Sequence, residues 1–176
     1  MLARGVSRRE IGHRIERRRL HVVQRGVYAV GHDVLSEQGK WMAAALCAGG
    51  AISHRTAGTA WEILSSPLLE VTAPRSRRRP GLRIYCHCLE ADEVVTMDGI
   101  PVTTVARTLL DLAVVLPPEQ LERAVNEAEV QRLLRPLQLQ RMLGRYPRRH
   151  GTPALSAILD DLRTVLGRDS ASRAVL

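Results

Sequence analysis

The sequence predicts an α+β fold, and three observations support this prediction. Short β-prone runs separated by turn residues recur between residues 20 and 103. From residue 104 onward, apolar residues follow helical spacing, as at Val105, Leu109, Leu112 and Ala113. Apolar residues make up 45% of the 176-residue chain, which is enough for a packed core. A chain of this length fits one ordinary domain or a small module joined to a larger domain.

The first predicted element is a helix that begins after Ser7 and ends near Arg18. Ser7 and Glu10 have the spacing of a capping box, in which serine begins a helix and glutamate follows three residues later. Ile11 and Ile15 lie one turn apart and form a narrow apolar stripe. Most other side chains of this helix are therefore expected on polar faces.

A β-hairpin is predicted directly after this helix. Residues 20–24 and 27–30 are β-prone, and Arg25-Gly26 between them has the length and composition of a tight turn. Gly31-His32-Asp33 ends the second strand. A helix followed closely by a hairpin is the closing half of a winged helix-turn-helix. We therefore assign residues 1–33 to a partial winged-helix DNA-binding module that lacks its first helices.

Residues 34–166 are expected to form a mixed α/β domain. Its first half predicts helices at residues 36–48 and 53–64, and strands at 68–73, 82–87, 93–96 and 100–103. Gly49-Gly50 ends the first of these helices, and Asp98-Gly99 forms the turn between the last two strands. Residues 74–80 are predicted to form a hairpin loop between the two longer strands.

The second half of this domain is predicted to be a C-terminal helical segment. One helix begins after Thr104, and another begins at Pro117-Pro118 with Leu121, Val125, Ala128 and Leu133 facing inward. A short helix at residues 137–143 and a last helix at 153–166 follow. Residues 167–176 have little to fold around, so a disordered tail is expected there.

The net charge of +8 is concentrated in the first 31 residues. This segment contains eight arginines and two glutamates, a net charge of +6, whereas the other 145 residues carry 18 basic and 16 acidic side chains, a net charge of +2. Codon bias can explain why arginine replaces lysine, but it does not explain why the excess lies at one end. Phosphate binding requires charge concentrated on one surface.

The predicted N-terminal helix carries this charge in the arrangement of a recognition helix. Arg8 and Arg9 occupy the end that reads base edges in the major groove, and Gly12 leaves room for close approach. Arg25 lies at the predicted hairpin tip, where a wing meets the phosphate backbone or the minor groove. The full set of predicted DNA-binding residues is Ser7, Arg8, Arg9, Gly12, His13, Arg14, Arg17, Arg18 and Arg25. A solvated basic face is the alternative interpretation.

Two further basic segments lie in predicted loops. For Arg75, Arg77, Arg78 and Arg79, a solvated loop and an auxiliary DNA contact are equally compatible with the sequence. Arg145, Arg148, Arg149 and His150 are predicted to form a solvated loop.

Cys86-His87-Cys88 contains metal-binding residue types without the spacing of a metal site. In a strand the two cysteines share a face and His87 points away, and a tetrahedral zinc site needs four ligands. We therefore predict buried cysteines that behave as small apolar residues, and expect no metal and no cofactor.

Other residue types associated with catalysis also have structural interpretations. Ser53 and His54 suggest a nucleophile and a base, but sequence neighbours rarely reach each other usefully, so Ser53 is predicted to be a helix N-cap. Asp92, Glu93 and Asp98 are predicted to be solvated turn acids. The sequence contains no glycine-rich phosphate loop and no hydrolase motif. We expect a non-enzymatic protein without catalytic residues.

Cysteine usage and hydropathy predict a cytoplasmic protein. The sequence contains three cysteines, a small and odd number that argues against a disulfide framework. No stretch approaches the roughly 20 apolar residues of a membrane span, and no apolar region follows the basic N-terminus as in a signal peptide.

Several short strings occur in a characteristic order across residues 4–135. They are Gly5-Val6-Ser7-Arg8-Arg9, Arg19-Leu20-His21, Arg25-Gly26-Val27-Tyr28-Ala29-Val30-Gly31-His32, Ser53-His54-Arg55-Thr56-Ala57, Glu70-Val71-Thr72, Arg78-Arg79-Pro80-Gly81, Ile100-Pro101-Val102-Thr103-Thr104 and Ala106-Arg107-Thr108-Leu109-Leu110-Asp111. Their order and spacing together resemble the actinobacterial AbiEi-like proteins, the antitoxin side of type IV toxin–antitoxin systems.

The resemblance implies a winged helix followed by an antitoxin-type α/β domain. It further implies a repressor that binds repeats in the promoter of its own operon, and a nucleotidyltransferase-like toxin that is opposed without a stable complex. By motif match, the DNA-facing positions are Ser7, Arg8, Arg9, Arg14, Arg17 and Arg25.

Two departures from this family leave alternatives open. A winged helix normally has helices before its recognition helix, whereas only residues 1–5 precede it here. Longer relatives continue into a nuclease-like domain resembling very-short-patch repair enzymes, and this sequence stops near Leu176. The alternatives are a non-enzymatic interaction module and a truncated remnant of a fused DNA endonuclease. Binding to DNA as a homodimer is compatible with the sequence.

Overall fold

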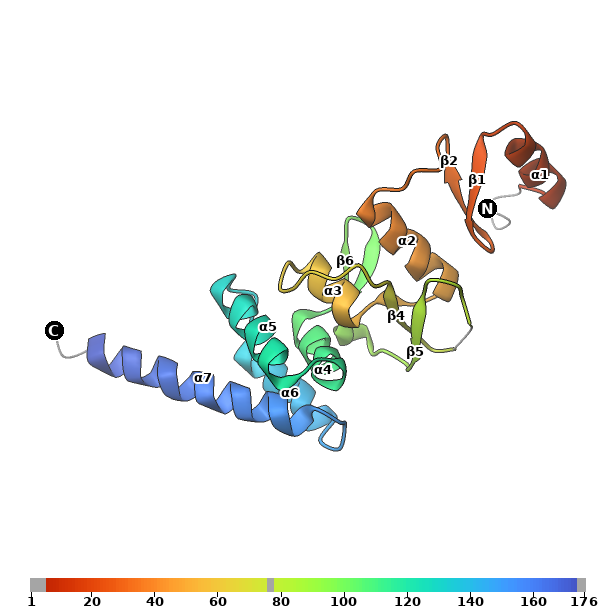
Figure 1. Ribbon diagram of the computed structural model, residues 1–176. Coiled ribbons are helices and arrows are strands. Elements are labelled where there is room, and N and C mark those ends of the chain that lie inside the picture. Colours follow the sequence, from red (N-terminus) through yellow and green to blue (C-terminus); the bar gives the residue numbers. More distant parts are fainter. Residues whose placement is uncertain (1–5, 76–77, 174–176) are drawn as a thin grey trace.

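The computed structural model describes residues 6–75 and 78–173 and confirms the predicted α+β fold. Seven α-helices and two β-sheets occur within these residues. The first helix and a hairpin lie at one end of an elongated molecule, and the last helix lies at the other (Figure 1). A five-stranded sheet lies between them.

The N-terminal unit contains the predicted helix and the predicted antiparallel hairpin. Helix α1 spans Arg8–Glu16, and Arg18 just beyond it has a left-handed backbone conformation (φ 53°) that turns the chain into the hairpin. Strands β1 (Leu20–Gln24) and β2 (Val27–Val30) pair around Arg25-Gly26, where Gly26 supplies the positive φ of 87° that the turn requires. Both strands contact helix α2 (Glu37–Ala48), so the hairpin rests on the rest of the fold.

The central sheet has the strand order β5-β4-β3-β7-β6. Its strands are β3 (Ala51–Ile52), β4 (Glu70–Ala73), β5 (Arg83–Cys86), β6 (Val94–Met97) and β7 (Ile100–Thr103). Strands β6 and β7 form the hairpin predicted around Asp98-Gly99, and a short 3₁₀ turn (Ala91–Glu93) precedes β6. Strand β3 is antiparallel to β4 and parallel to β7.

The prediction of a hairpin loop between the two longer strands is wrong, because β4 and β5 run parallel. The connection from Ala73 to Arg83 therefore joins two parallel strands. Alternation of side chains is the same for either strand direction, so the sequence pattern does not distinguish them. The parallel register places Arg83 beside Glu70, whose buried carboxylate accepts hydrogen bonds from Arg83 and Tyr85.

The first hydrophobic core lies between the sheet and helices α2 and α3 (His54–Ala60). Its buried residues are Ala44, Ala45, Ile52, Ala57, Val71, Ile100 and Val102. Ser36 caps α2, and Gly49 ends it with a left-handed conformation (φ 67°), as the predicted stop requires. Helix α3 is shorter than predicted, because the backbone N–H groups of Ile63 and Leu64 bond to the carbonyl of Gly58 and close its end.

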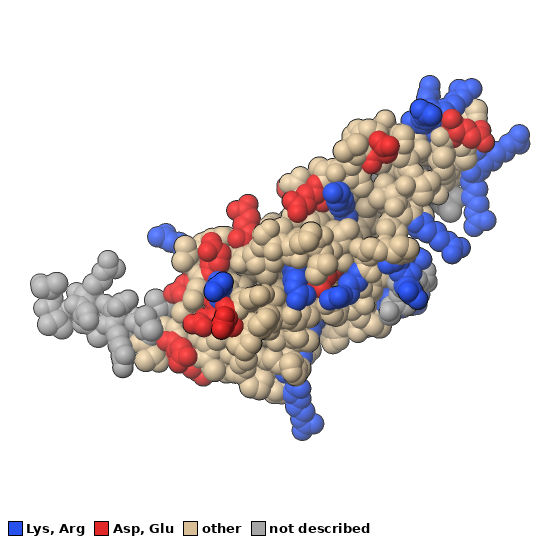
Figure 2. Space-filling view, viewed as in Figure 1, with Lys and Arg blue, Asp and Glu red and all other residues tan. Residues whose placement is uncertain are grey.

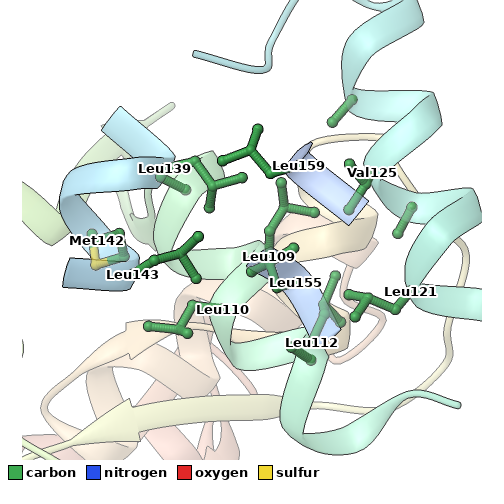
Figure 3. Close-up of a cluster of buried hydrophobic side chains, with 14 of the residues drawn as sticks. Leu109, Leu110, Leu112, Leu121, Val125, Leu139, Met142, Leu143, Leu155 and Leu159 are labelled. Atoms are coloured by element: carbon green, nitrogen blue, oxygen red, sulfur yellow. The ribbon is translucent and has the colours of Figure 1, made fainter. Parts of the chain in front are cut away.

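The second core is mostly helical and surrounds α4 (Val105–Val115), with Ile63 from the segment after α3 added to it. Helices α5 (Pro118–Val130), α6 (Pro136–Arg145) and α7 (Thr152–Arg173) pack around it. Figure 3 shows leucines of α4, including Leu109 and Leu112, at the centre of this cluster. Helix α7 extends past residue 166 into the segment expected to be a disordered tail, since residues 160–173 contain no proline to end it. None of the described helices combines the length and the apolar composition needed to cross a membrane.

Candidate nucleic-acid interface and buried charge networks

The N-terminus of α1 is capped by Ser7. The Oγ atom of Ser7 accepts a hydrogen bond from the backbone N–H of Glu10 (3.2 Å). The carboxylate of Glu10 accepts a hydrogen bond from Arg14 one turn later. Arg8 and Arg9 are exposed at the start of the helix, where the free backbone N–H groups and the helix dipole also favour anions.

Helix α1 packs against strand β1 and leaves most of its basic side chains exposed. Ile11 of α1 and Leu20 of β1 are buried at 7% and 3% exposure. A Cβ atom at Gly12 would meet no other atom within 4 Å, so the surface at this position is open, as the predicted close approach requires. Among the other predicted contact residues, Ser7, His13, Arg17 and Arg18 are exposed and Arg14 is half-buried.

The hairpin tip and the loop of residues 74–82 touch each other. The side-chain Nε2 of Gln24 donates a hydrogen bond to the carbonyl oxygen of Pro80 (3.3 Å). Arg25 is exposed at the tip. In the loop, Arg75 and Arg78 are exposed, Arg79 is half-buried, and Arg77 lies outside the described residues. The structure therefore brings together two basic segments that are far apart in sequence.

Charged side chains are unevenly distributed over the visible face of the molecule. Figure 2 shows lysine and arginine side chains along the end formed by α1 and the hairpin, and most acidic side chains away from that end. This distribution agrees with the net charge of +6 over residues 1–31. The described residues of this segment therefore form a basic surface that includes helix α1 and the turn of the β1–β2 hairpin.

The prediction of a solvated basic loop near residue 148 is wrong for two of its arginines, which bind acidic side chains. Arg145 donates to both carboxylate oxygens of Asp92, each at 2.8 Å. Arg149 reaches inward and donates to the fully buried Asp111. Acidic partners neutralise both guanidinium groups, which makes them poor candidates for phosphate binding. Arg148 and His150 are exposed.

Ser53 and His54 contact each other, contrary to the prediction. The Oγ atom of Ser53 lies 2.9 Å from Nδ1 of His54, and the Thr72 hydroxyl donates to Ser53 Oγ at 2.8 Å. Ser53 precedes α3, but its side chain makes no capping hydrogen bond. His54 has a left-handed backbone (φ 50°), a conformation that L-residues rarely adopt and that accompanies this contact between sequence neighbours.

The His54 ring is neutral in the folded protein. Burial, together with the nearby charges of Arg149 and Arg107, lowers the pKa of His54 to about 2, so its ring is neutral. The Oγ atom of Ser53 accepts from Thr72 and forms a second hydrogen bond with Nδ1 of the His54 ring. Nε2, the other ring nitrogen, is buried and has no hydrogen-bond partner in the described parts of the chain.

The Ser53–His54 pair is closed to a substrate in this structure. Ser53, His54 and Thr72 are each at most 1% exposed. The His54 ring stacks on Tyr85, with ring centroids 3.5 Å apart and planes inclined by 13°. The arrangement therefore joins α3 to strands β4 and β5 as part of the packing.

We expect His54 to make the free energy of unfolding depend on pH. The folded pKa of about 2 lies below the ordinary value of 6.5, so the unfolded chain binds a proton that the folded chain does not bind. The contribution is complete above the unfolded pKa and is lost as the pH falls below it, at about 1.4 kcal/mol per pH unit. Urea unfolding at pH 7 and pH 5 measures this loss in the wild type and in His54→Asn, because asparagine tolerates a left-handed backbone.

Between these two pH values, His54→Asn should lose about 2 kcal/mol less than the wild type. The comparison uses the change in each protein, so a lower stability of the variant at pH 7 does not affect it. Equal losses in both proteins would show that the buried ring does not control the acid sensitivity.

A second buried network links the sheet to the helical core. Arg107 of α4 is fully buried, and its Nη1 and Nε donate to Glu93 and Asp111, both at 3.0 Å. The Tyr146 hydroxyl donates to the other oxygen of Glu93 (2.8 Å). Burial raises the pKa of Asp111, while Arg107 and Arg149 act in the opposite direction. These contacts connect the turn before β6 with α4 and with the loop before α7.

The network corrects the prediction for Glu93, which is fully buried and not a solvated turn acid. Asp98 is exposed, and Asp92 is exposed but bound to Arg145. One sequence signal could have indicated the network. Arg107 and Asp111 are separated by four residues in a helix that is otherwise mostly apolar, so both must face the interior together.

The prediction of buried cysteines is also wrong. Cys86 and Cys88 are both exposed, because β5 is an edge strand and Cys88 lies beyond its end. His87 packs edge-on against Tyr146, with ring centroids 5.7 Å apart. Within the described residues, no group of three or more potential metal ligands comes together.

In comparisons with known proteins, the sequence matches no protein-family model and no curated protein.

Proposed function

We propose that the protein is a cytoplasmic DNA-binding transcriptional regulator that binds double-stranded DNA through α1 and the β1–β2 hairpin. In this proposal α1 is the recognition helix of a winged helix-turn-helix and the hairpin is its wing. The main supporting observation is that α1 buries Ile11, half-buries Ile15 and leaves Arg8 and Arg9 exposed beside a capped helix N-terminus.

The geometry of α1 suits the major groove of B-DNA. The groove is about 12 Å wide and admits one helix, whose N-terminal side chains then reach the base edges. Arg8 and Arg9 occupy that end, whereas Arg17 and Arg18 lie beyond the other end of the helix. The first pair would therefore contact bases and the second pair phosphates. Arg25 at the hairpin tip would contact the backbone or the minor groove.

The resemblance to AbiEi-like proteins supports a more specific form of this proposal. The protein would be the antitoxin of a toxin–antitoxin system and a repressor of its own operon. Its paired toxin would be a nucleotidyltransferase-like protein, opposed without a stable complex. Repression requires preference for the promoter over other DNA, so sequence specificity is the property to measure.

The first test compares binding to the protein's own upstream DNA with binding to a scrambled duplex of equal length. We expect tighter binding to the upstream DNA, and a preference that persists at about 0.15–0.2 M salt, because base contacts depend less on counterion release than phosphate contacts do. Fluorescence anisotropy over a series of salt concentrations measures both quantities. Equal, strongly salt-dependent binding to the two duplexes would contradict the regulator proposal.

A further inference from the structure

We propose that the tip of the β1–β2 hairpin and the described residues between β4 and β5 (74–75 and 78–82) form one surface that binds the phosphate backbone of double-stranded DNA. We call it the junction surface, and its described residues are Gln24, Arg25, Arg75, Arg78, Arg79 and Pro80. The inference rests on the proposed DNA-binding function and adds a part of the α/β half of the chain to the interface.

A direct contact joins the two segments of the junction surface. Gln24 is the last residue of β1, and its side chain donates to the carbonyl of Pro80, 56 residues later in sequence. The contact therefore lies next to the Arg25 turn on one side and next to Arg78 and Arg79 on the other. It brings the backbone that carries Arg25 close to the backbone that carries Arg79.

The arginine-bearing end of the loop is itself anchored to the fold. Arg79 and Leu82 form an isolated antiparallel bridge, with the Leu82 N–H donating to the Arg79 carbonyl at 3.2 Å. Leu82 packs against the core between the sheet and α2. A charged loop held in this way loses less conformational freedom on binding than an unanchored one.

The charge of the two segments points to a polyanion. Residues 17–32 and 71–89 together contain nine arginines and neither aspartate nor glutamate. Among the described arginines of this set, Arg83 is the one that contacts the carboxylate of Glu70. The Nε atom of Arg79 is buried and lacks a hydrogen-bond partner among the residues that the structure describes. Gathering like charges is unfavourable unless an anion neutralises them.

A DNA backbone fits this surface better than a single small anion. The arginines are spread from α1 through the hairpin tip to the loop, and a duplex offers phosphate oxygens at regular intervals along such a path. Because phosphate contacts do not read sequence, the junction surface should add affinity without adding specificity. The role of the junction surface therefore differs from that of Arg8 and Arg9, which would contact bases.

The test is the double variant Arg75→Ala with Arg78→Ala, with DNA binding measured over a series of salt concentrations. We expect about tenfold weaker binding to the upstream duplex and the scrambled duplex alike. The slope of log K against log salt should become shallower by about 1.8, since each phosphate contact contributes about 0.9. Arg141→Ala with Arg148→Ala removes the same charge from exposed positions of the helical half and should leave the slope unchanged.

Gln24→Ala tests the contact itself, because it keeps every charge. We expect about threefold weaker binding, as for the loss of one hydrogen bond that positions the loop. An unchanged slope in the arginine variant, or wild-type affinity in Gln24→Ala, would overturn the junction surface. If the wild type itself shows no preference for its upstream DNA, the proposed function has failed instead.

Discussion

Replacing Arg8 and Arg9 with alanine is expected to weaken binding to the protein's own upstream DNA by roughly a hundredfold. A bidentate arginine–guanine contact contributes about 1–3 kcal/mol of discrimination, and two such contacts account for a loss of this size. Binding to a scrambled duplex should weaken much less, because base contacts supply sequence preference. Fluorescence anisotropy with both duplexes measures the two losses.

The matched control for this experiment is Arg141→Ala with Arg148→Ala, which lowers the net charge equally. Both positions are exposed, and they lie in and after α6, in the helical half of the molecule. Circular dichroism of Arg8→Ala with Arg9→Ala establishes that α1 and the hairpin are still folded. If the affinity and the salt dependence of this variant match those of the control, α1 is not the recognition helix.

The helices and turns that were predicted correctly depend on local signals. Ser7 and Glu10 begin α1, and Arg25-Gly26 turns the hairpin, because a cap and a tight turn each involve only a few neighbouring residues. Gly49 ends α2 for the same reason. The charge concentration is visible without any knowledge of the fold.

The parts that were predicted wrongly depend on contacts between distant segments. The sequence pattern does not show that β4 and β5 run parallel, and only this arrangement brings Arg83 beside Glu70. Nor does it show that the segments of Gln24 and Pro80 meet. In the sequence Arg149 has the features of an exposed loop residue. Its partner, Asp111, is identified only when the structure shows α4 next to it.

Buried charged residues were the most difficult to predict from the sequence, because a charged residue in a turn-rich stretch is usually solvated. Glu93 is buried only because Arg107 and Tyr146 are there to satisfy it. Each of these residues therefore depends on the others to remain buried. The proposed DNA interface lies outside this network, so stability and DNA binding should be separable by mutation.

Arg107→Met tests the network and is expected to lower the free energy of unfolding by about 3–5 kcal/mol at pH 7. Methionine keeps much of the apolar volume but leaves the carboxylates of Glu93 and Asp111 buried with fewer donors. Urea unfolding followed by circular dichroism measures the loss. Arg14→Ala, which removes an exposed ion pair with Glu10, is the control and should change stability by no more than about 0.5 kcal/mol.

Because a loss of this size approaches the whole stability of a small domain, a second variant keeps the test informative. Adding Glu93→Gln and Asp111→Asn to Arg107→Met removes the uncompensated charges and should recover part of the lost stability. Lower pH should also narrow the gap between Arg107→Met and the wild type. Without Arg107 the folded pKa of Asp111 rises further, so the folded variant takes up a proton as the pH falls. A loss no larger than that of Arg14→Ala, or a gap that widens toward pH 5, would show that Arg107 does not hold the sheet and the helical core together.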